Sequence, residues 1–406
     1  MSELRAGCCV VGGGPAGMMA ALLFARAGVP TVLLEKHADF LRDFRGDTIH
    51  PSTLDVMDEL GVLESFLQRP HQEVTTLAGN LGETLITVAD FTHLPTRCKF
   101  VAFMPQWDFL NFLAEEAKRF PTFDLRMQAR AQELLWENGR VAGVRAQTPE
   151  GTLEVRADLT IAADGRESVL RNDARLDVVE LGAPMDILWL RLSKRAEDPH
   201  ETFGYVRDGR IMALIDRGVY WQCAYVIPKG TLAELHRRGL GEFHAQIGAI
   251  VPFLADRVGE LASWDDVKLL TVRVNRLRRW YSPGLLCIGD AAHAMSPIGG
   301  VGINLAIQDA VASANMLAPK LLRGGVDERD LAAVQRRRES AARFTQALQL
   351  FIQRRIIGRV LTNGRAPFLH RLPALLRWLP FLPRIPGRLV GLGFRPEHVL
   401  NLPVRE

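Results

Sequence analysis

The stretch LLCIGDAAHAMSPIGGVGINLAIQDA, which begins at Leu285, places one carboxylate and one imidazole between two ordered elements. The short apolar run 285–288 predicts a buried strand, and 304–310 predicts the first turns of a helix. Asp290 follows the strand directly, and His293 stands three residues later. A carboxylate and an imidazole at the end of a strand can bind a polar ligand or exchange protons with it.

The loop before the helix has little side-chain bulk, because Gly299, Gly300 and Gly302 follow one another closely. Glycine lets the backbone approach a ligand, and a helix N-terminus offers unpaired N–H groups and a positive potential. The loop is therefore predicted to hold something flat, polar and electron-rich. Taken alone, the stretch leaves open the alternative of a strand-to-helix turn without a ligand.

A second glycine-rich segment, CCVVGGGPAGMMAALLFARAGVPTVLLEK, begins at Cys8. Gly12, Gly14 and Gly17 give G-x-G-x-x-G between a predicted strand and a predicted helix, and Glu35 ends the next strand. Glycines there admit a pyrophosphate, and an acidic residue about 20 positions on binds ribose hydroxyls. The segment predicts dinucleotide binding. Because Glu35 would repel a 2′-phosphate, FAD or NAD fits better than NADP.

With these two segments and a third, the sequence resembles the FAD-dependent aromatic hydroxylases, single-component monooxygenases similar to p-hydroxybenzoate hydroxylase. The third segment, DLTIAADGRESVLR, lies between the other two and resembles the family's Asp-Gly motif. RDFRGDTIHPST resembles the arginine-bearing flavin loop, with Arg45 as the contact. MPQWDFLNFL resembles the segment whose glutamine, here Gln106, reaches FAD. The motifs appear in the family's order and span most of residues 8–310.

The resemblance implies that Asp290 bonds the ribityl chain of FAD, while the loop and helix after it face the flavin ring and stabilise its anionic reduced form. From the motifs and the resemblance together, the expected FAD contacts are Gly12, Gly14, Pro15, Ala16, Gly17, Glu35, Lys36, Arg45, Gln106, Asp164, Gly165, Arg166, Gly289, Asp290, Pro297, Gly300, Gly302, Ile303 and Asn304.

Three residues are candidates for a catalytic role. The resemblance places Pro297 beside the flavin C4a position, where dioxygen adds to give a hydroperoxide. His50 and His293 stand beside the expected flavin loops, and imidazole can transfer protons near neutral pH. A structural hydrogen bond is the alternative for each histidine. The remaining histidines show no metal-ligand spacing, and no metal is predicted.

The implied fold is α/β, with a discontinuous Rossmann-like FAD-binding domain, an inserted antiparallel sheet that binds substrate, and a C-terminal helical segment. The expected divisions are 1–75, 98–180 and 270–350 for FAD, 76–97 and 181–269 for substrate, and 351–406 for the basic, apolar helical segment.

Local patterns support the inserted sheet, since four strand-like runs are separated by turns. Tyr205, Tyr220, Trp221 and Tyr225 fall in these runs. They could line a pocket for a flat substrate, although cross-strand packing predicts the same enrichment. The four runs are 185–192, 201–207, 210–216 and 219–228.

Composition indicates a globular protein of 406 residues, 48% apolar and 24% charged. Five cysteines without a C-x-x-C pair favour buried thiols and a cytoplasmic location. Residues 354–406 hold ten arginines against two glutamates, a net +8, whereas the whole chain carries +4 and residues 1–353 therefore −4. This tail could touch an anionic membrane, but packing against the body of the protein is favoured. No nucleic-acid motif accompanies the charge.

The sequence thus predicts a monooxygenase that uses FAD, dioxygen and NADPH or NADH as a transient reductant to hydroxylate or epoxidise an electron-rich aromatic or polycyclic molecule. A reductase of the same fold acting on a prenyl or other apolar substrate is the first alternative. A flavin-binding protein without turnover is the second. The sequence leaves open the substrate, the choice of nicotinamide and whether the protein is a monomer or a homodimer.

Overall fold

The first sheet of the computed structural model is built around β1, whose last four residues are all buried. The order is β19-β20-β11-β1-β2-β8, with β10 and β9 continuing from β11. Strands β20, β11, β1, β2 and β8 run parallel. The bounds are β1 Ser2–Val11, β2 Thr31–Leu34, β8 Phe123–Arg126, β9 Arg130–Glu137, β10 Arg140–Thr148, β11 Gly151–Ala162, β19 Tyr281–Ser282 and β20 Leu285–Cys287. The structure describes residues 2–41, 48–82, 84–199, 203–363, 375, 376 and 378–400.

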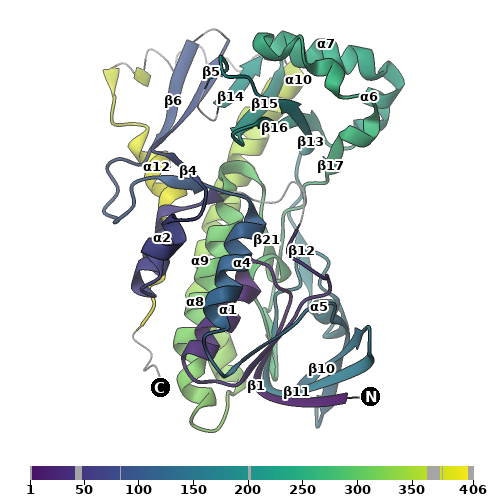
Figure 1. Cartoon of the computed structure of the whole chain (residues 1–406), viewed down its shortest axis with the longest axis vertical. Coiled ribbons are helices and arrows are strands. Elements are labelled where there is room, and N and C mark those ends of the chain that lie inside the picture. Colours follow the sequence, from purple (N-terminus) through teal and green to yellow (C-terminus); the bar gives the residue numbers. More distant parts are fainter. Residues whose placement is uncertain are drawn as a thin grey trace.

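Helices cover this sheet and form one large apolar core with it. Helix α1, apolar almost all round, packs against both α8 and α4. Helices α8 and α9 run side by side along the length of the molecule (Figure 1). The bounds are α1 Pro15–Arg26, α2 Pro51–Glu59, α3 Leu63–Leu67, α4 Gln106–Ala117, α5 Val169–Asp173, α8 Val301–Leu321 and α9 Glu328–Ile352.

A seven-stranded sheet forms the other end of the molecule (Figure 1), in the order β17-β13-β16-β15-β14-β5-β6. It combines two stretches far apart in the chain through the parallel pair β14 and β5. Strands β13–β16 match the four predicted runs, and α6 and α7 pack on one face of the sheet. The bounds are β5 Thr76–Leu81, β6 Thr84–Asp90, β13 Met185–Ser193, β14 Phe203–Arg207, β15 Arg210–Asp216, β16 Tyr220–Pro228, β17 Lys268–Leu270, α6 Leu232–Arg238 and α7 Leu240–Ile250.

Two small sheets and several 3-10 turns complete the fold of the described residues. One small sheet has the order β3-β7-β4 and another β12-β18-β21. The bounds are β3 Thr48–Ile49, β4 Gln72–Val74, β7 Val101–Phe103, β12 Val178–Glu180, β18 Asn275–Leu277 and β21 His293–Ala294; the 3-10 turns are η1 Pro252–Leu254, η2 Val258–Glu260, η3 Trp264–Asp266, η4 Gly289–Ala291 and η5 Ile298–Gly300.

The described parts of the C-terminal segment, 351–363 and 378–400, pack against the body of the protein, as the sequence favoured. Helix α9 continues through the π-helical turn η6 (Gln353–Ile357) into α10 (Gly358–Asn363), which reaches β15 and β16. Helix α12 (Arg384–Gly391) lies against β6 (Figure 1). All five cysteines are buried, consistent with their role as small apolar side chains. Within the described ranges, no helix is long and apolar enough to cross a membrane.

Candidate active site

The first glycine turn has two closely packed positions and one open position. A Cβ added at Gly12 would lie 2.4 Å from the carbonyl oxygen of Ala163, and one added at Gly17 would lie 1.9 Å from that of Gly12. A Cβ at Gly14 would meet nothing within 4 Å. Helix α1 begins directly after Gly14, with no side-chain cap and no acidic residue in its first turn. The turn therefore leaves N–H groups and space for a pyrophosphate.

Glu35 follows β2 and is almost fully buried. Its Oε2 accepts a hydrogen bond from Gly13 N at 2.8 Å, while its Oε1 accepts one from His37 N at 3.0 Å. These bonds fix the carboxylate beside the glycine turn, where a ribose would lie next to the pyrophosphate. The neighbouring Lys36 is exposed.

The Asp-Gly loop after β11 touches both other motifs. Asp164 Oδ2 accepts from Val169 N at 2.8 Å, and burial raises the pKa of this carboxyl group. Gly165 has a φ of +86°, which a side chain rarely adopts. Arg166 Nε donates to Asp290 Oδ2 at 2.8 Å. Two residues 124 positions apart in the chain are thereby joined at one edge of the sheet.

The stretch that begins at Leu285 is called here the Gly-Asp motif, after Gly289 and Asp290, and it completes this arrangement at the end of β20. Ile288 N donates to the carbonyl of Ala162 at 3.0 Å. Gly289, with φ +58°, packs so closely on α1 that an added Cβ would lie 3.0 Å from Ala16 Cβ. The carboxyl ends of β1, β11 and β20 thus present all three motifs together, the usual ligand edge of an open α/β sheet.

The bare loop before α8 is a sharply turned segment. Gly299 and Gly300 have φ of +75° and +63°, and a Cβ at Gly300 would lie 2.3 Å from Thr48 Oγ1. Pro297 opens this turn as the residue before η5. Helix α8 begins at Val301, three residues before the helix start expected from the pattern, because Gly302 fits a helical turn without a clash.

Asn304 is held by the first turn of α2. Its Oδ1 accepts from Ser52 Oγ at 2.6 Å and from Thr53 Oγ1 at 2.9 Å. Ile303 is buried beside it. Gln106 is half-buried and is the first residue of α4, as Pro15 is the first residue of α1. Arg45 lies outside the described residues.

His50 is buried next to the turned loop. Its Nδ1 donates to the carbonyl of Val390 at 2.7 Å, and its Nε2 lies 3.3 Å from Thr48 Oγ1. Burial lowers the pKa of His50 to about 4, although its backbone contacts with Val390 and Gly300 act in the opposite direction. The imidazole is therefore neutral at pH 7, and its contacts support the structural alternative. Its catalytic role stays a prediction.

His293 lies behind the Gly-Asp motif with 1% of its side chain exposed. Its Nε2 contacts Asp309 Oδ2 at 2.6 Å, and its ring packs on Trp280 with centroids 4.9 Å apart. This position connects His293 to α8 and to the core. The geometry again supports a structural role, and no contact links the ring to the turned loop at Gly299–Gly300 among the described residues.

Three glutamines of α9 and η6 were not predicted to belong to the site. Gln349 accepts from Ser296 N at 3.1 Å and donates to the carbonyls of Ser296 and Ile298, each at 2.9 Å. Gln346 donates to the carbonyls of Asn275 and Ala294 at 2.7 and 3.1 Å. Gln353 donates to Ser296 Oγ. Their spacing of three and four residues was the available signal, since it places polar side chains on one helical face.

Three of the four aromatic residues noted in the sequence, Tyr205, Trp221 and Tyr225, pack into the cluster beneath α6 and α7. Tyr225 packs edge-on against Phe243 of α7, with centroids 5.2 Å apart. Trp221 shares that cluster and donates to Asp198 Oδ2 at 2.9 Å. Tyr205 packs on the same cluster, whereas Tyr220 lies under Arg191 at 4.8 Å. Packing thus accounts for Tyr205, Trp221 and Tyr225, whereas alternation along β16 places Tyr220 on the opposite face, and a pocket role for it stays a prediction.

The opposite face of the same sheet carries a smaller apolar cluster, in which two positions are alanine. Ile187, Trp189, Ala213 and Ala224 cluster there together with Leu350 of α9. Strand alternation puts these residues on the side away from α6 and α7. This face, which packs on Leu350, lies toward α9.

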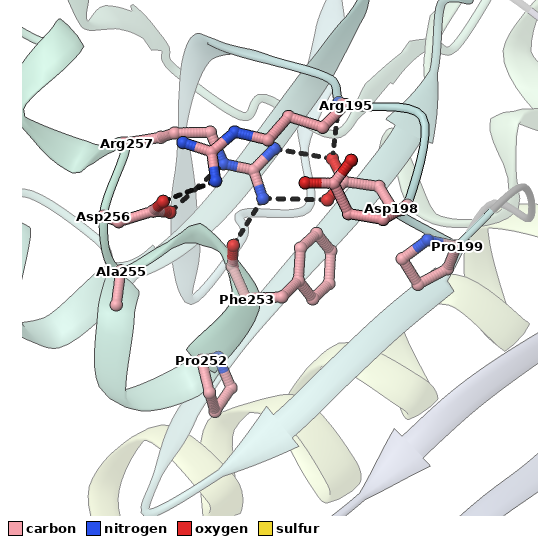
Figure 2. A pocket seen from close by; sticks show the side chains of 9 residues that line it. Arg195, Asp198, Pro199, Pro252, Phe253, Ala255, Asp256 and Arg257 are labelled. Carbon is pink, nitrogen blue, oxygen red and sulfur yellow. Dashed lines mark hydrogen bonds and ion pairs between the residues drawn. The ribbon is translucent and has the colours of Figure 1, made fainter.

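A separate hollow of about 350 Å³ lies between the turn after β13 and the end of α7 (Figure 2). Its charged lining residues pair with one another: Arg257 Nη1 with Asp198 Oδ2 at 2.6 Å, and Arg195 Nη1 with Asp256 Oδ2 at 2.5 Å. No predicted site residue lines this hollow. It is distinct from the edge where the three motifs meet.

Comparisons with known proteins also indicate an FAD-binding protein. A family profile described as FAD binding domain matches residues 5–348. The 6-methylpretetramide 4-monooxygenase of Streptomyces rimosus is 36% identical over 377 residues, covering 90% of this chain and 89% of that protein.

Two solved structures share the fold. The anhydrotetracycline hydroxylase OxyS of Streptomyces rimosus has a TM-score of 0.74 at 23% identity, over 97% of this chain and 77% of its own. PqsL of P. aeruginosa in complex with 2-aminobenzoylacetate also has a TM-score of 0.74, at 20% identity, over 89% of this chain and 98% of its own. The chain belongs to the FAD-binding family of flavin-dependent aromatic monooxygenases.

Proposed function

We propose that this protein uses FAD, NAD(P)H and dioxygen to hydroxylate a polycyclic aromatic molecule. The observation that carries the proposal is the convergence of the three motifs at one sheet edge, with an open glycine cradle at Gly14. The relative named for 6-methylpretetramide, similar along almost the whole chain, supports a polycyclic substrate.

The residues at this edge fit the cofactor. Gly14 and the first turn of α1 would take the pyrophosphate, and the buried carboxylate of Glu35 would bind ribose hydroxyls. Asp290, oriented by its ion pair with Arg166, would accept from the ribityl hydroxyls. Bound FAD supplies the electron transfer and the activation of dioxygen, which no side chain can supply.

Other parts of the chain would orient the substrate and exclude water. The loop from Pro297 to Gly300 leaves room beside the flavin because it carries little side-chain bulk. The apolar sheet face with Ala213 and Ala224 would accommodate a flat ring system that larger side chains would obstruct. These two surfaces would hold an aromatic ring facing the flavin.

The test is oxygen consumption by the purified protein with NADPH and with NADH, in the presence of phenols, linear polycyclic phenols and quinone precursors. We expect a polycyclic phenol to stimulate consumption and to give a product heavier by one oxygen atom from ¹⁸O-labelled dioxygen. Flavin reduction without stimulated oxygen uptake would favour the reductase alternative. No nicotinamide oxidation above background with any compound would favour a flavin-binding protein without turnover.

A further inference from the structure

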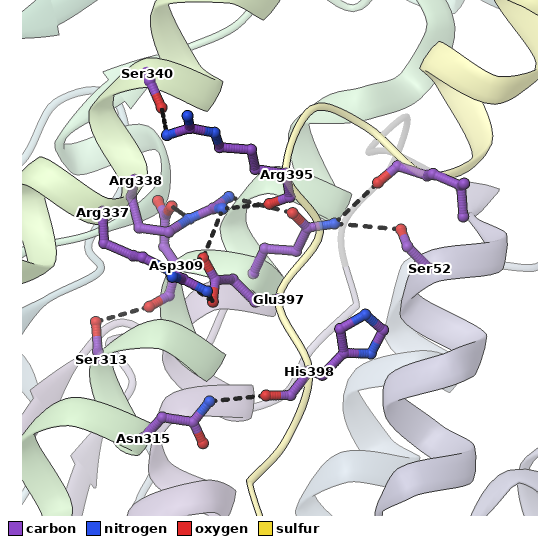
Figure 3. A network of polar contacts seen from close by, with 12 residues as sticks. Ser52, Asp309, Ser313, Asn315, Arg337, Arg338, Ser340, Arg395, Glu397 and His398 are labelled. Atoms are coloured by element: carbon purple, nitrogen blue, oxygen red, sulfur yellow. Dashed lines mark hydrogen bonds and ion pairs between the residues drawn. The ribbon is translucent and has the colours of Figure 1, made fainter.

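A buried ion-pair network joins the Gly-Asp motif to α9 and to the C-terminal strap, defined here as residues 390–400. Figure 3 shows the part of it that links Asp309, Arg338 and Glu397. At its centre Asp309 of α8 accepts from Gly289 N at 3.1 Å, from His293 Nε2 at 2.6 Å and from Arg338 Nε at 3.0 Å. The side chains of Asp309, His293 and Arg338 are each at most 1% exposed. Burial would raise the pKa of Asp309, but the charges and hydrogen bonds of His293 and Arg338 hold it below its usual value.

The network fixes the turn that carries Asp290. Gly289 immediately precedes Asp290, and His293 follows it by three residues, so Asp309 holds both ends of this turn. The Asp290 side chain itself is bonded on the other side, to Arg166. Movement of the Asp309 carboxylate would therefore shift the residue expected to bond the cofactor.

Arg338 connects Asp309 to the strap. Besides Asp309, its guanidinium donates to the carbonyl of Arg395 at 3.1 Å, to Glu397 Oε1 at 3.3 Å and to Gln308 Oε1 at 3.3 Å. Arginine suits this place because its planar fork reaches several acceptors at once. Without Glu397 and the Arg395 carbonyl, a fully buried cation would lose half of its acceptors.

The strap also contacts the other side of the site. The carbonyl of Val390 accepts from His50, which lies beside Gly300, and the carbonyl of Leu392 accepts from Gln308 Nε2 at 3.3 Å. Strap contacts therefore reach His50 beside the turned loop, α8 and Arg338. The strap thus supports the expected cofactor site from two sides, although it contributes no motif to it.

We propose that Arg338 is a positioning residue that couples docking of the strap to the shape of the Asp290 turn, so that FAD affinity depends on the strap. The inference rests on the proposed function only in assuming that FAD lies at Asp290. It needs no assumption about the substrate or the oxidised product.

The experiment compares Arg338→Gln, Glu397→Gln and Arg337→Gln with the wild type. Arg337 is the matched control, because it bonds the same Glu397 carboxylate at 2.9 Å but stands 61% exposed and has no contact with Asp309. Holoenzyme is diluted and released flavin is followed by fluorescence, which gives the Kd for FAD. Urea unfolding of each FAD-free variant and visible circular dichroism of the bound flavin complete the measurements.

We expect the Kd for FAD to rise about tenfold or more in Arg338→Gln, since loss of a supporting contact commonly weakens a bound group by such factors. Glu397→Gln should raise the Kd by a smaller factor, and Arg337→Gln should leave it unchanged. The circular dichroism of the flavin should change in Arg338→Gln at temperatures where the protein remains folded.

A lower unfolding midpoint with an unchanged Kd and flavin spectrum would show that Arg338 only stabilises the fold, and would overturn the proposal. So would an equal rise in Kd in Arg337→Gln. If Arg338→Gln fails to fold, Glu397→Gln decides, because it keeps the arginine and the shape of its partner. A wild type that binds no FAD would contradict the cofactor assignment itself, a result distinct from these.

Discussion

Single residues at the motif edge show how closely the backbone must pack for the site to exist. Gly12 and Gly17 bring the glycine turn, α1 and the Asp-Gly loop into contact, whereas Gly14 faces open space. The same residue type therefore serves folding at two positions and ligand approach at the third. Substitution can separate the two roles.

Gly14→Val should abolish FAD binding with little loss of stability. A Cβ added at Gly14 meets no protein atom within 4 Å, and the φ of −75° at this position suits any residue. The methyl groups of valine would occupy the space left for the pyrophosphate. The flavin-to-protein absorbance ratio after purification and the urea midpoint of the FAD-free protein measure both effects.

Gly17→Ala is the contrasting variant, because its Cβ would overlap the carbonyl of Gly12 and should lower both FAD content and stability. A Gly14→Val protein that retains a full complement of FAD would contradict the placement of the pyrophosphate.

His50 should make the protein sensitive to acid. Its pKa is lowered by burial from 6.5 to about 4, so the unfolded chain takes up a proton before the folded protein does. Its contribution to stability is complete above pH 6.5 and is lost as the pH falls from 6.5 to 4. We expect about 2 kcal/mol to be lost between pH 7 and pH 5.

His50→Asn is the matched variant, since its amide can still donate to the carbonyl of Val390 but does not titrate. The free energy of unfolding, measured in urea at pH 7 and pH 5, should fall by about 2 kcal/mol less in the variant than in the wild type. Equal losses in the two proteins would show that His50 is not the titrating group.

At the scale of elements, α9 buries polar side chains beside the apolar ones that it adds to the core. Gln335, Arg338, Gln346 and Gln349 are all buried on it, and each bonds a backbone or side-chain group of a neighbouring segment. A buried polar side chain must find partners, and here the partners are the loops that carry the site. The helix thereby holds irregular backbone in one conformation.

Gln349→Met should loosen the loop at Pro297. The change leaves Ser296 N and the carbonyls of Ser296 and Ile298 without their partner, which should cost about 1–3 kcal/mol. We also expect a smaller share of oxidised NAD(P)H to appear as hydroxylated product, because the loop beside the flavin is less fixed.

Arg343→Met is the control on the exposed face of α9, where we expect stability within about 0.5 kcal/mol of the wild type. Product yield per NAD(P)H oxidised and the urea unfolding free energy are the two measurements. A Gln349→Met protein that matches this control in both would contradict the role of the glutamine.

At the scale of the whole molecule, the chain crosses repeatedly between its two sheets and returns at its C-terminus to join them. The strap bonds α8 and α9, while α12 lies on β6 of the seven-stranded sheet. Gly387 permits this contact, because an added Cβ would lie 2.0 Å from the carbonyl oxygen of Asp90.

Gly387→Ala should therefore displace α12 and destabilise the protein by about 1–3 kcal/mol, the usual cost of overpacking against backbone. Urea unfolding and the rate of tryptic cleavage after Arg384 and Arg388 report the change. Ile385→Ala, at a side chain that is 54% exposed, should leave both near the wild-type values. Comparable behaviour of the two variants would show that α12 does not depend on close packing at Gly387.

The sequence alone was sufficient for the local parts of the site. The glycine turn with Glu35, and the strand–loop–helix unit at Asp290, each lie within one continuous segment of fewer than about 30 residues, so their spacing carried the signal. The same holds for β13–β16, where alternation and turn residues lie within each hairpin.

Only the tertiary structure decided which distant residues meet and which face of each element they use. Arg166 and Asp290, or Arg338 and Glu397, are brought together by parallel strands and packed helices rather than by any local pattern. The tyrosines of the inserted sheet could face either side, since a shift of one residue in strand register exchanges the two faces. Propensity fixes the strand, but packing against α7 fixes the side.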